Sequence, residues 1–150
     1  MKRLLLFTLL FLPLSVFAQG FSEDRTSLAN FLRRVHNQTN FEGIKIIQDY
    51  NYSYFISALS LEKARFQRNS DMFRVAQVRA MRQASEFVNG GVITSDLIIR
   101  TAETEDSAEV TLETIERIRS VGFTQGMELL INFVTPDNRY MVFIYSRKIE

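Results

Sequence analysis

The stretch SDMFRVAQVRAMRQASEFVNGG, residues 70–91, decides the fold of this chain. It is the longest helical pattern in the sequence, and its alanines recur once per turn at Ala76, Ala80 and Ala84. Because alanine has a short side chain, this narrow face lets a helix approach a β-sheet closely. Ser70 is the predicted N-cap, and the Asn-Gly-Gly at the end is a predicted helix stop. The stretch therefore predicts one long helix packed on a sheet.

The opposite side of this predicted helix is not purely polar. Val75 and Val78 lie there among arginines. Three accounts stay open: an N-terminal helix covers these valines, a second subunit covers them, or they are simply exposed, as single apolar residues often are. Val75 and Val78 are therefore candidate interaction residues.

Before the long helix, the sequence predicts an N-terminal helix and a β-hairpin. Residues 22–36 are amphipathic, with apolar residues at helical spacing. His36, the single histidine, closes this segment, and we interpret it as a helix-end residue because no second histidine and no cysteine exists to complete a metal site.

Residues 41–61 have the alternation of a hairpin with its turn at residues 49–51. Three tyrosines gather around that turn: Tyr50, Tyr52 and Tyr54. Such aromatic residues either form cross-strand pairs that hold a sheet together or bind a partner. They are the second group of candidate interaction residues.

After the long helix, residues 92–102 resume strand character, with Leu97 and Ile99 expected on one face. An acidic run without Lys or Arg follows over residues 103–116. Residues 110–121 fit a helix through Leu112, Ile115 and Ile118 and fit a strand through their β-branched content, which we favour.

Residues 126–134 and 139–148 read as two further strands, joined by a turn at residues 135–138 with proline in second position. Both strands are apolar on both faces, with Leu129, Ile131 and Phe133 expected to share one face. A strand that is apolar on both faces is usually covered on both faces. The sequence therefore predicts an α+β fold: one long helix packed on a curved antiparallel sheet of about four to six strands, with an additional N-terminal amphipathic helix.

Residues 1–18 have the pattern of a secretory signal peptide. Lys2 and Arg3 precede an apolar run, and Val16-Phe17-Ala18 provides a cleavage site. The run is shorter than the roughly 20 residues that span a bilayer, and an uncleaved anchor segment is the alternative. We expect residues 19–150 to form a single α+β domain, in which residues 19–40 are the N-terminal helix and linker.

The composition excludes several kinds of site. Without Lys2 and Arg3, 16 basic residues remain against 17 acidic ones, and a nucleic-acid-binding protein would usually show a basic excess. The chain has no cysteine, so it has neither a cysteine nucleophile nor a lipidated cysteine. It has no phosphate-binding loop and no dinucleotide fingerprint. We therefore predict no catalytic residues, no cofactor and no metal.

The order of elements over residues 44–148 resembles a known group of envelope proteins. A hairpin leads into a helix with Ala76, Ala80 and Ala84, a strand follows, and then a Ser-x-Gly turn at residues 120–122 precedes an amphipathic hairpin ending in VFIYSRK. This arrangement is similar to small LPP-type outer-membrane lipoproteins and to the N-terminal domain of flagellar assembly protein T. The resemblance implies a helix packed on an antiparallel sheet, and a structural or assembly role in or near a bacterial cell envelope.

These observations predict a non-enzymatic exported protein, a structural or protein-interaction module of the bacterial cell envelope. It would be periplasmic or secreted, or associated with the outer membrane, with no membrane span after signal cleavage. Its expected partner is an envelope protein or a second copy, and not nucleic acid. The alternative is a periplasmic small-ligand-binding or hydrolytic protein with a pocket between helix and sheet. A space filled by Phe73, Phe87, Ile99 and Phe143 would remove that alternative.

Overall fold

The computed structural model describes residues 23–49, 52–90, 97–100, 115–116, 118–119 and 126–149. The named elements, in chain order, are α1 (Glu23–Thr39), β1 (Gly43–Asp49), β2 (Tyr52–Glu62), the short 3-10 turn η1 (Lys63–Arg65), α2 (Asn69–Val88), β3 (Ile98–Arg100), β4 (Glu128–Val134) and β5 (Tyr140–Ile149). Predictions on the signal peptide, on Tyr50 and on the acidic residues 103–113 lie outside the described residues.

The strands form one five-stranded sheet in the order β3-β1-β2-β5-β4. The β1–β2, β2–β5 and β4–β5 pairs are antiparallel, whereas β3 runs parallel to β1. The α+β prediction is confirmed, but the prediction of a wholly antiparallel sheet is wrong at this edge. The alternation of residues along a short strand is the same whether it pairs in the parallel or the antiparallel direction. The direction of β3 is therefore set by the path of the chain between α2 and the sheet.

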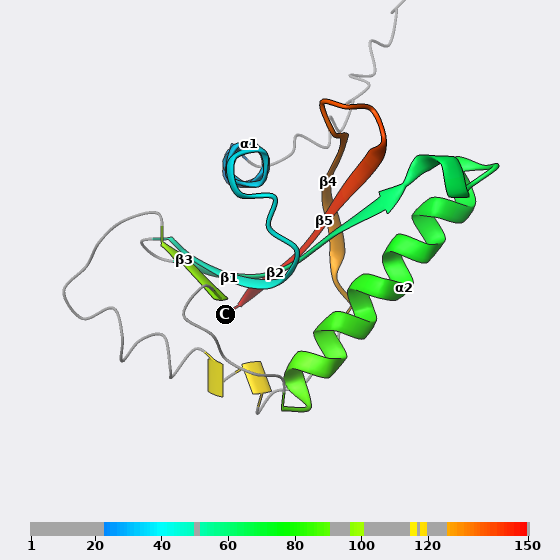
Figure 1. The fold of residues 1–150 in the computed structure, drawn as a ribbon. Helices are drawn as coiled ribbons and strands as arrows, with labels where there is room; N and C mark the ends of the chain where they lie inside the picture. Colours follow the sequence, from blue (N-terminus) through cyan, green and yellow to red (C-terminus); the bar gives the residue numbers. More distant parts are fainter. Residues whose placement is uncertain are drawn as a thin grey trace, which may run out of the picture.

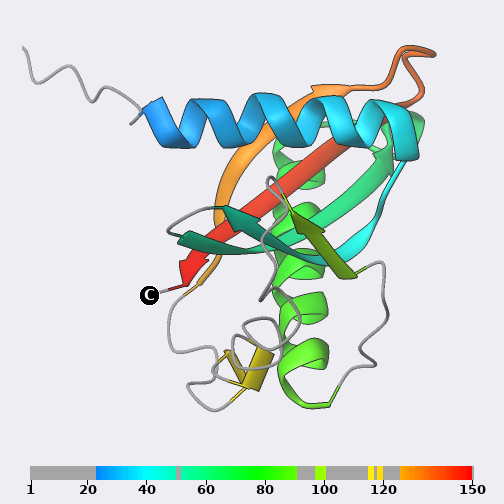
Figure 2. The same ribbon diagram turned by 90° about the vertical axis from the view of Figure 1, so that its left-hand side faces the viewer.

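The two helices lie on opposite faces of the sheet, as Figure 1 shows, and run in different directions across it (Figure 2). The face under α2 carries a core that we call the α2-side core; it includes Phe55, Leu59, Phe87 and Phe143. The face under α1 carries the α1-side core; it includes Leu28, Leu32, Ile47, Ile56, Val142 and Ile144. The apolar residues on both faces of β5 thus each have a covering helix, as predicted.

The alanine face of α2 packs on the sheet as predicted. Ala76, Ala80 and Ala84 are completely buried. At the C-terminal end, Gly90 adopts φ +112° and its N–H donates to the carbonyl of Phe87 at 3.3 Å, which confirms the predicted glycine stop. The predicted N-cap is wrong: the cap position is Arg68, which makes no side-chain cap, and Ser70 lies inside the first turn.

The C-terminal hairpin has the predicted turn, and β5 has the predicted faces, with Phe143 and Tyr145 on the α2-side core and Val142 and Ile144 on the α1-side core, but β4 does not. The Asn138 N–H donates to the Thr135 carbonyl at 2.8 Å, and the Thr135 N–H donates to the Tyr140 carbonyl at 3.0 Å. A register shift between Leu129 and Ile131 interrupts β4. Because a bulge inserts one residue into a strand, Leu129 packs on the α2-side core while Ile131 packs on the α1-side core. The prediction that these two residues share a face is therefore wrong.

Two further predictions are corrected between α2 and β4. Residues 115–116 and 118–119 are helical, and not the strand that their β-branched content favoured. Ile115 and Ile118 are buried together in the α2-side core, since a spacing of three places them on one helix face. Ile99 of β3 packs on the α1-side core, while Leu97, which precedes β3, belongs to the α2-side core. The prediction that Leu97 and Ile99 share one face is therefore wrong.

Candidate interaction surface

The side of α2 that faces away from the sheet carries exposed apolar side chains. Val78 is 64% exposed and Met81 is 38% exposed. Arg74, Val78 and Arg82 are spaced by four residues, and Met81 follows Val78 by three, which places Val78 beside each of the other three on the helix surface. We call this set the α2 outer patch. Val78 lies on the side of α2 opposite the completely buried Ala76, Ala80 and Ala84, whereas Met81 lies at the edge of that side, close to Gly126.

Four arginines lie on α2 or at its N-cap, and one of them, Arg82, has an acidic partner among the described residues. Arg82 donates to Glu86 at 2.7 Å in an exposed ion pair within the helix. The guanidinium groups of Arg68, Arg74 and Arg79 are exposed and make no hydrogen bond or ion pair in the part of the chain that the structure describes. Arginine and methionine are enriched at protein interfaces, where guanidinium groups pair with carboxylates.

Of the two predicted valines, the structure places only Val78 on this surface. Val75 is half-buried and packs against the α2-side core, so its prediction as an outward-facing residue is wrong. It follows the buried Met72 by three residues, which draws it toward the packed side. Met81 was missed, although its spacing of three from Val78 was a usable signal.

Of the three predicted tyrosines, the structure describes only the side chain of Tyr54. Tyr50 lies outside the described residues, and Tyr52 begins β2, with its side chain also outside the description. Tyr54 is half-buried and packs against the α1-side core. This placement agrees with the alternative role of the aromatic residues, in which they hold the sheet together.

The space between α2 and the sheet is filled by side chains. The rings of Phe73 and Phe143 meet edge-on with centroids 5.0 Å apart, and those of Phe55 and Phe87 lie 5.4 Å apart. Ile99, expected in the same space, packs on the other face.

A polar contact also crosses this layer. The buried Ser57 hydroxyl donates to Oε1 of Gln83 at 2.6 Å, which links β2 to α2. The contact satisfies a hydroxyl that would be costly to bury alone.

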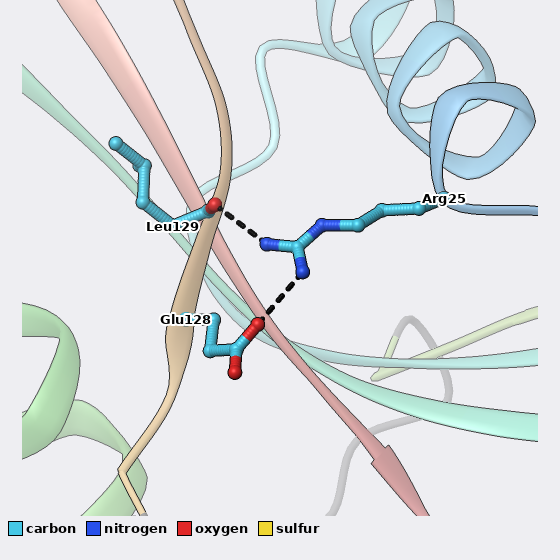
Figure 3. Close-up of polar contacts among 3 residues, drawn as sticks. All are labelled: Arg25, Glu128 and Leu129. Carbon is cyan, nitrogen blue, oxygen red and sulfur yellow. Dashed lines mark hydrogen bonds and ion pairs between the residues drawn. The ribbon is translucent and has the colours of Figure 1, made fainter. Parts of the chain in front are cut away.

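On the other face, α1 is anchored at both ends. Near its start, Arg25 donates from Nη1 to Oε2 of Glu128 at 2.7 Å and from Nη2 to the carbonyl of Leu129 at 3.0 Å (Figure 3). Near its end, His36 lies between two aromatic rings, with centroids 5.5 Å from Phe41 and 5.4 Å from Phe133.

His36 is far more buried than a helix-end residue was expected to be. It is only 2% exposed, and its Nε2 has no hydrogen-bond partner in the described structure. Burial lowers the pKa of His36 below its ordinary value, and the nearby carboxylate of Glu42 opposes that effect. The neutral imidazole is therefore the form that fits this site.

Neither a metal-ligand cluster nor a membrane-spanning segment stands out in the described ranges. Within them, no three His, Asp or Glu side chains gather where they could hold a metal ion. None of the helices described is both long enough and apolar enough to cross a bilayer.

Comparison with known proteins adds no relative from which a role could be transferred. No protein-family model, no curated protein and no solved structure matches this chain. The resemblance to the LPP-type lipoproteins and to the flagellar assembly domain stays a prediction.

Proposed function

We propose that this protein is a non-enzymatic interaction module that binds a protein partner through the α2 outer patch. Following the predicted signal peptide, we place it outside the cytoplasm, as a structural or protein-interaction module of a bacterial cell envelope. The observation that carries the proposal is Val78, which is 64% exposed on α2, where the guanidinium groups of Arg74 and Arg79 pair with none of the described residues.

The charges of the patch define the chemistry of the partner. Arg74 and Arg79, which pair with none of the described residues, favour a surface with Asp or Glu side chains, because a guanidinium group bonds a carboxylate through two parallel N–H donors. Val78 and Met81 favour an apolar contact within that acidic rim. The partner is therefore a protein segment that presents an apolar side chain among carboxylates.

The alternative of a ligand pocket under α2 has no supporting observation. Phe73, Phe87 and Phe143 occupy the space where such a pocket would lie. A binding site needs a cavity lined by several convergent polar groups, and the polar contact described between β2 and α2 is the closed Ser57–Gln83 hydrogen bond.

Site-specific photocrosslinking in the native cell tests the proposal. A benzoylphenylalanine at position 78 should crosslink one partner, and the same residue at the exposed position Gln38 on α1 should not. The double substitution Arg74→Glu and Arg79→Glu should reduce the crosslink at position 78 at least tenfold, and so should high salt.

Three results would count against the acidic protein partner. Equal crosslinking at positions 78 and 38 would mean that the patch is ordinary surface. A crosslink of twice the chain's own mass would identify a second copy as the occupant. A lipid adduct whose yield follows the anionic lipid content would identify a membrane surface instead.

A further inference from the structure

The N-terminal helix, α1, packs on the sheet through a short row of buried side chains that ends at an ionisable residue, His36. The buried side chains described in α1 are Leu28, Leu32 and His36, one per turn along a single stripe. On the other face, α2 buries five side chains: Met72, Ala76, Ala80, Ala84 and Phe87. The α1 contact is thus shorter, and one of its three buried side chains can acquire a charge.

The site around His36 accepts the neutral ring and offers little to the charged one. The imidazole packs edge-on against Phe41 and Phe133, and its Nε2 has no hydrogen-bond partner among the described residues. A protonated imidazole has two N–H donors and a positive charge. Burial of a charge without a paired group is unfavourable.

The charged groups on the elements around His36 do not form a complete counter-ion site. Glu42, on the connector after α1, is the acidic group that favours protonation, but its side chain is exposed. Arg33 and Arg34 on α1 are both positive, and the Arg33 guanidinium lies 5.4 Å from the Phe133 ring centroid. Lys45 on β1 is also positive, is buried, and points to the same sheet face as Ile47.

Apart from the apolar side chains of α1, the ion pair near its start is largely exposed. The Arg25–Glu128 pair at the start of α1 is largely exposed on the Glu128 side, where the side chain is 72% accessible. Exposed ion pairs contribute little to stability. The connector to β1 is short and includes Asn40 at φ +49°, so a released α1 would remain tethered beside the sheet.

We propose that His36 is a pH-sensitive latch: it holds α1 on the sheet while its ring is neutral and releases α1 when the ring is protonated. Release would uncover the apolar face formed by Ile47, Ile56, Val142 and Ile144. This face is distinct from the α2 outer patch, and the latch does not depend on the function proposed for that patch.

The direction of the pH effect follows from the burial of His36. Its pKa is lower in the folded state than in the unfolded chain, so the docked state binds fewer protons than the released state. Docking is therefore fully stable above about pH 6.5, the ordinary value for histidine. It weakens as the pH falls below that value, by at most about tenfold in the opening equilibrium per pH unit.

Because the chain has one histidine, its titration can be followed without assignment problems. We expect the imidazole NMR signals of the full chain to titrate below pH 6.5. In hydrogen exchange corrected for intrinsic rates, α1 amides should open progressively more between pH 7.5 and 5, while α2 amides should keep their protection.

Two variants test whether protonation of His36, and not a general effect of acid on the fold, opens α1. His36→Phe should keep the aromatic packing and remove the pH dependence of α1 opening. Glu42→Gln removes the carboxylate that raises the pKa of His36, so the histidine should titrate at a lower pH than in the native chain.

The latch is overturned if His36 titrates at or above pH 6.5. It is also overturned if α1 opens with the same pH dependence in His36→Phe as in the native chain. Simultaneous opening of α1 and α2 amides in the native chain would show global acid unfolding, which again excludes it. The NMR titration of the native chain shows whether His36 titrates below pH 6.5 even if the His36→Phe variant does not fold.

Discussion

The two faces of the sheet are covered by helices of similar length in different ways. Under α2, small alanines bring the helix close while large aromatic rings fill the sides, and the Ser57–Gln83 hydrogen bond crosses the layer. Under α1, the helix buries one stripe, with Arg25 bonded to β4 near its start and His36 buried near its end. The comparison shows that α2 packs on the sheet through a longer buried face than α1. We propose above that protonation of His36 releases α1 from the sheet.

Overpacking the α2 contact should produce the largest effect. Ala80→Leu adds three heavy atoms where Ala80 is completely buried, and overpacking of this kind costs about 1–3 kcal/mol. Urea unfolding followed by far-UV circular dichroism measures the loss. Gln77→Leu introduces the same leucine at an exposed position of the same helix and should change stability by less than about 0.5 kcal/mol. If the two variants are equally stable, the alanine face is not closely packed.

Loosening the start of α1 should have a smaller and local effect. Arg25→Ala removes the ion pair to Glu128 and the hydrogen bond to the Leu129 carbonyl, and partly exposed contacts of this kind contribute about 0.5–1 kcal/mol. Hydrogen exchange should show faster opening in α1 and unchanged protection in α2. Arg34→Ala, at an exposed position of the same helix, is the control. Equal loss of protection in both helices would mean that α1 is part of one cooperative core.

The smallest effect is expected on the outside of α2. Val78→Ser changes a side chain that is 64% exposed, so the free energy of unfolding should change by less than about 0.5 kcal/mol. Thermal unfolding of the isolated protein measures this. A strong destabilisation would show that Val78 is buried within the folded protein in solution, and the α2 outer patch would then be no interaction surface.

Patterns carried by neighbouring residues predicted much of this fold. The alanine repeat predicted the packed face of α2, and proline in second position predicted the turn at residues 135–138. The apolar residues on both faces of β5 predicted a cover on each side. These signals are local, because helix periodicity, turn geometry and strand alternation are set within a few residues.

The candidate surface was predicted less well, because burial near the edge of a helix face depends on what lies beside it. Val75 and Val78 looked alike in sequence, yet Val75 reaches the α2-side core and Val78 does not. Tyr54 was likewise predicted as a candidate binding residue, but in the structure it packs against the α1-side core.

By itself, the sequence determined the main helix, the hairpins and the need for two covering layers, since each follows from the periodicity or turn chemistry of adjacent residues. Only the tertiary structure decided the parallel direction of β3, the bulge that turns Leu129 to the other face, and the burial of His36 between Phe41 and Phe133. Each of these depends on residues that are distant in the chain or on the path of the backbone between elements. The proposed α1 latch belongs to this second group, because it depends on the fold placing a lone histidine against apolar rings.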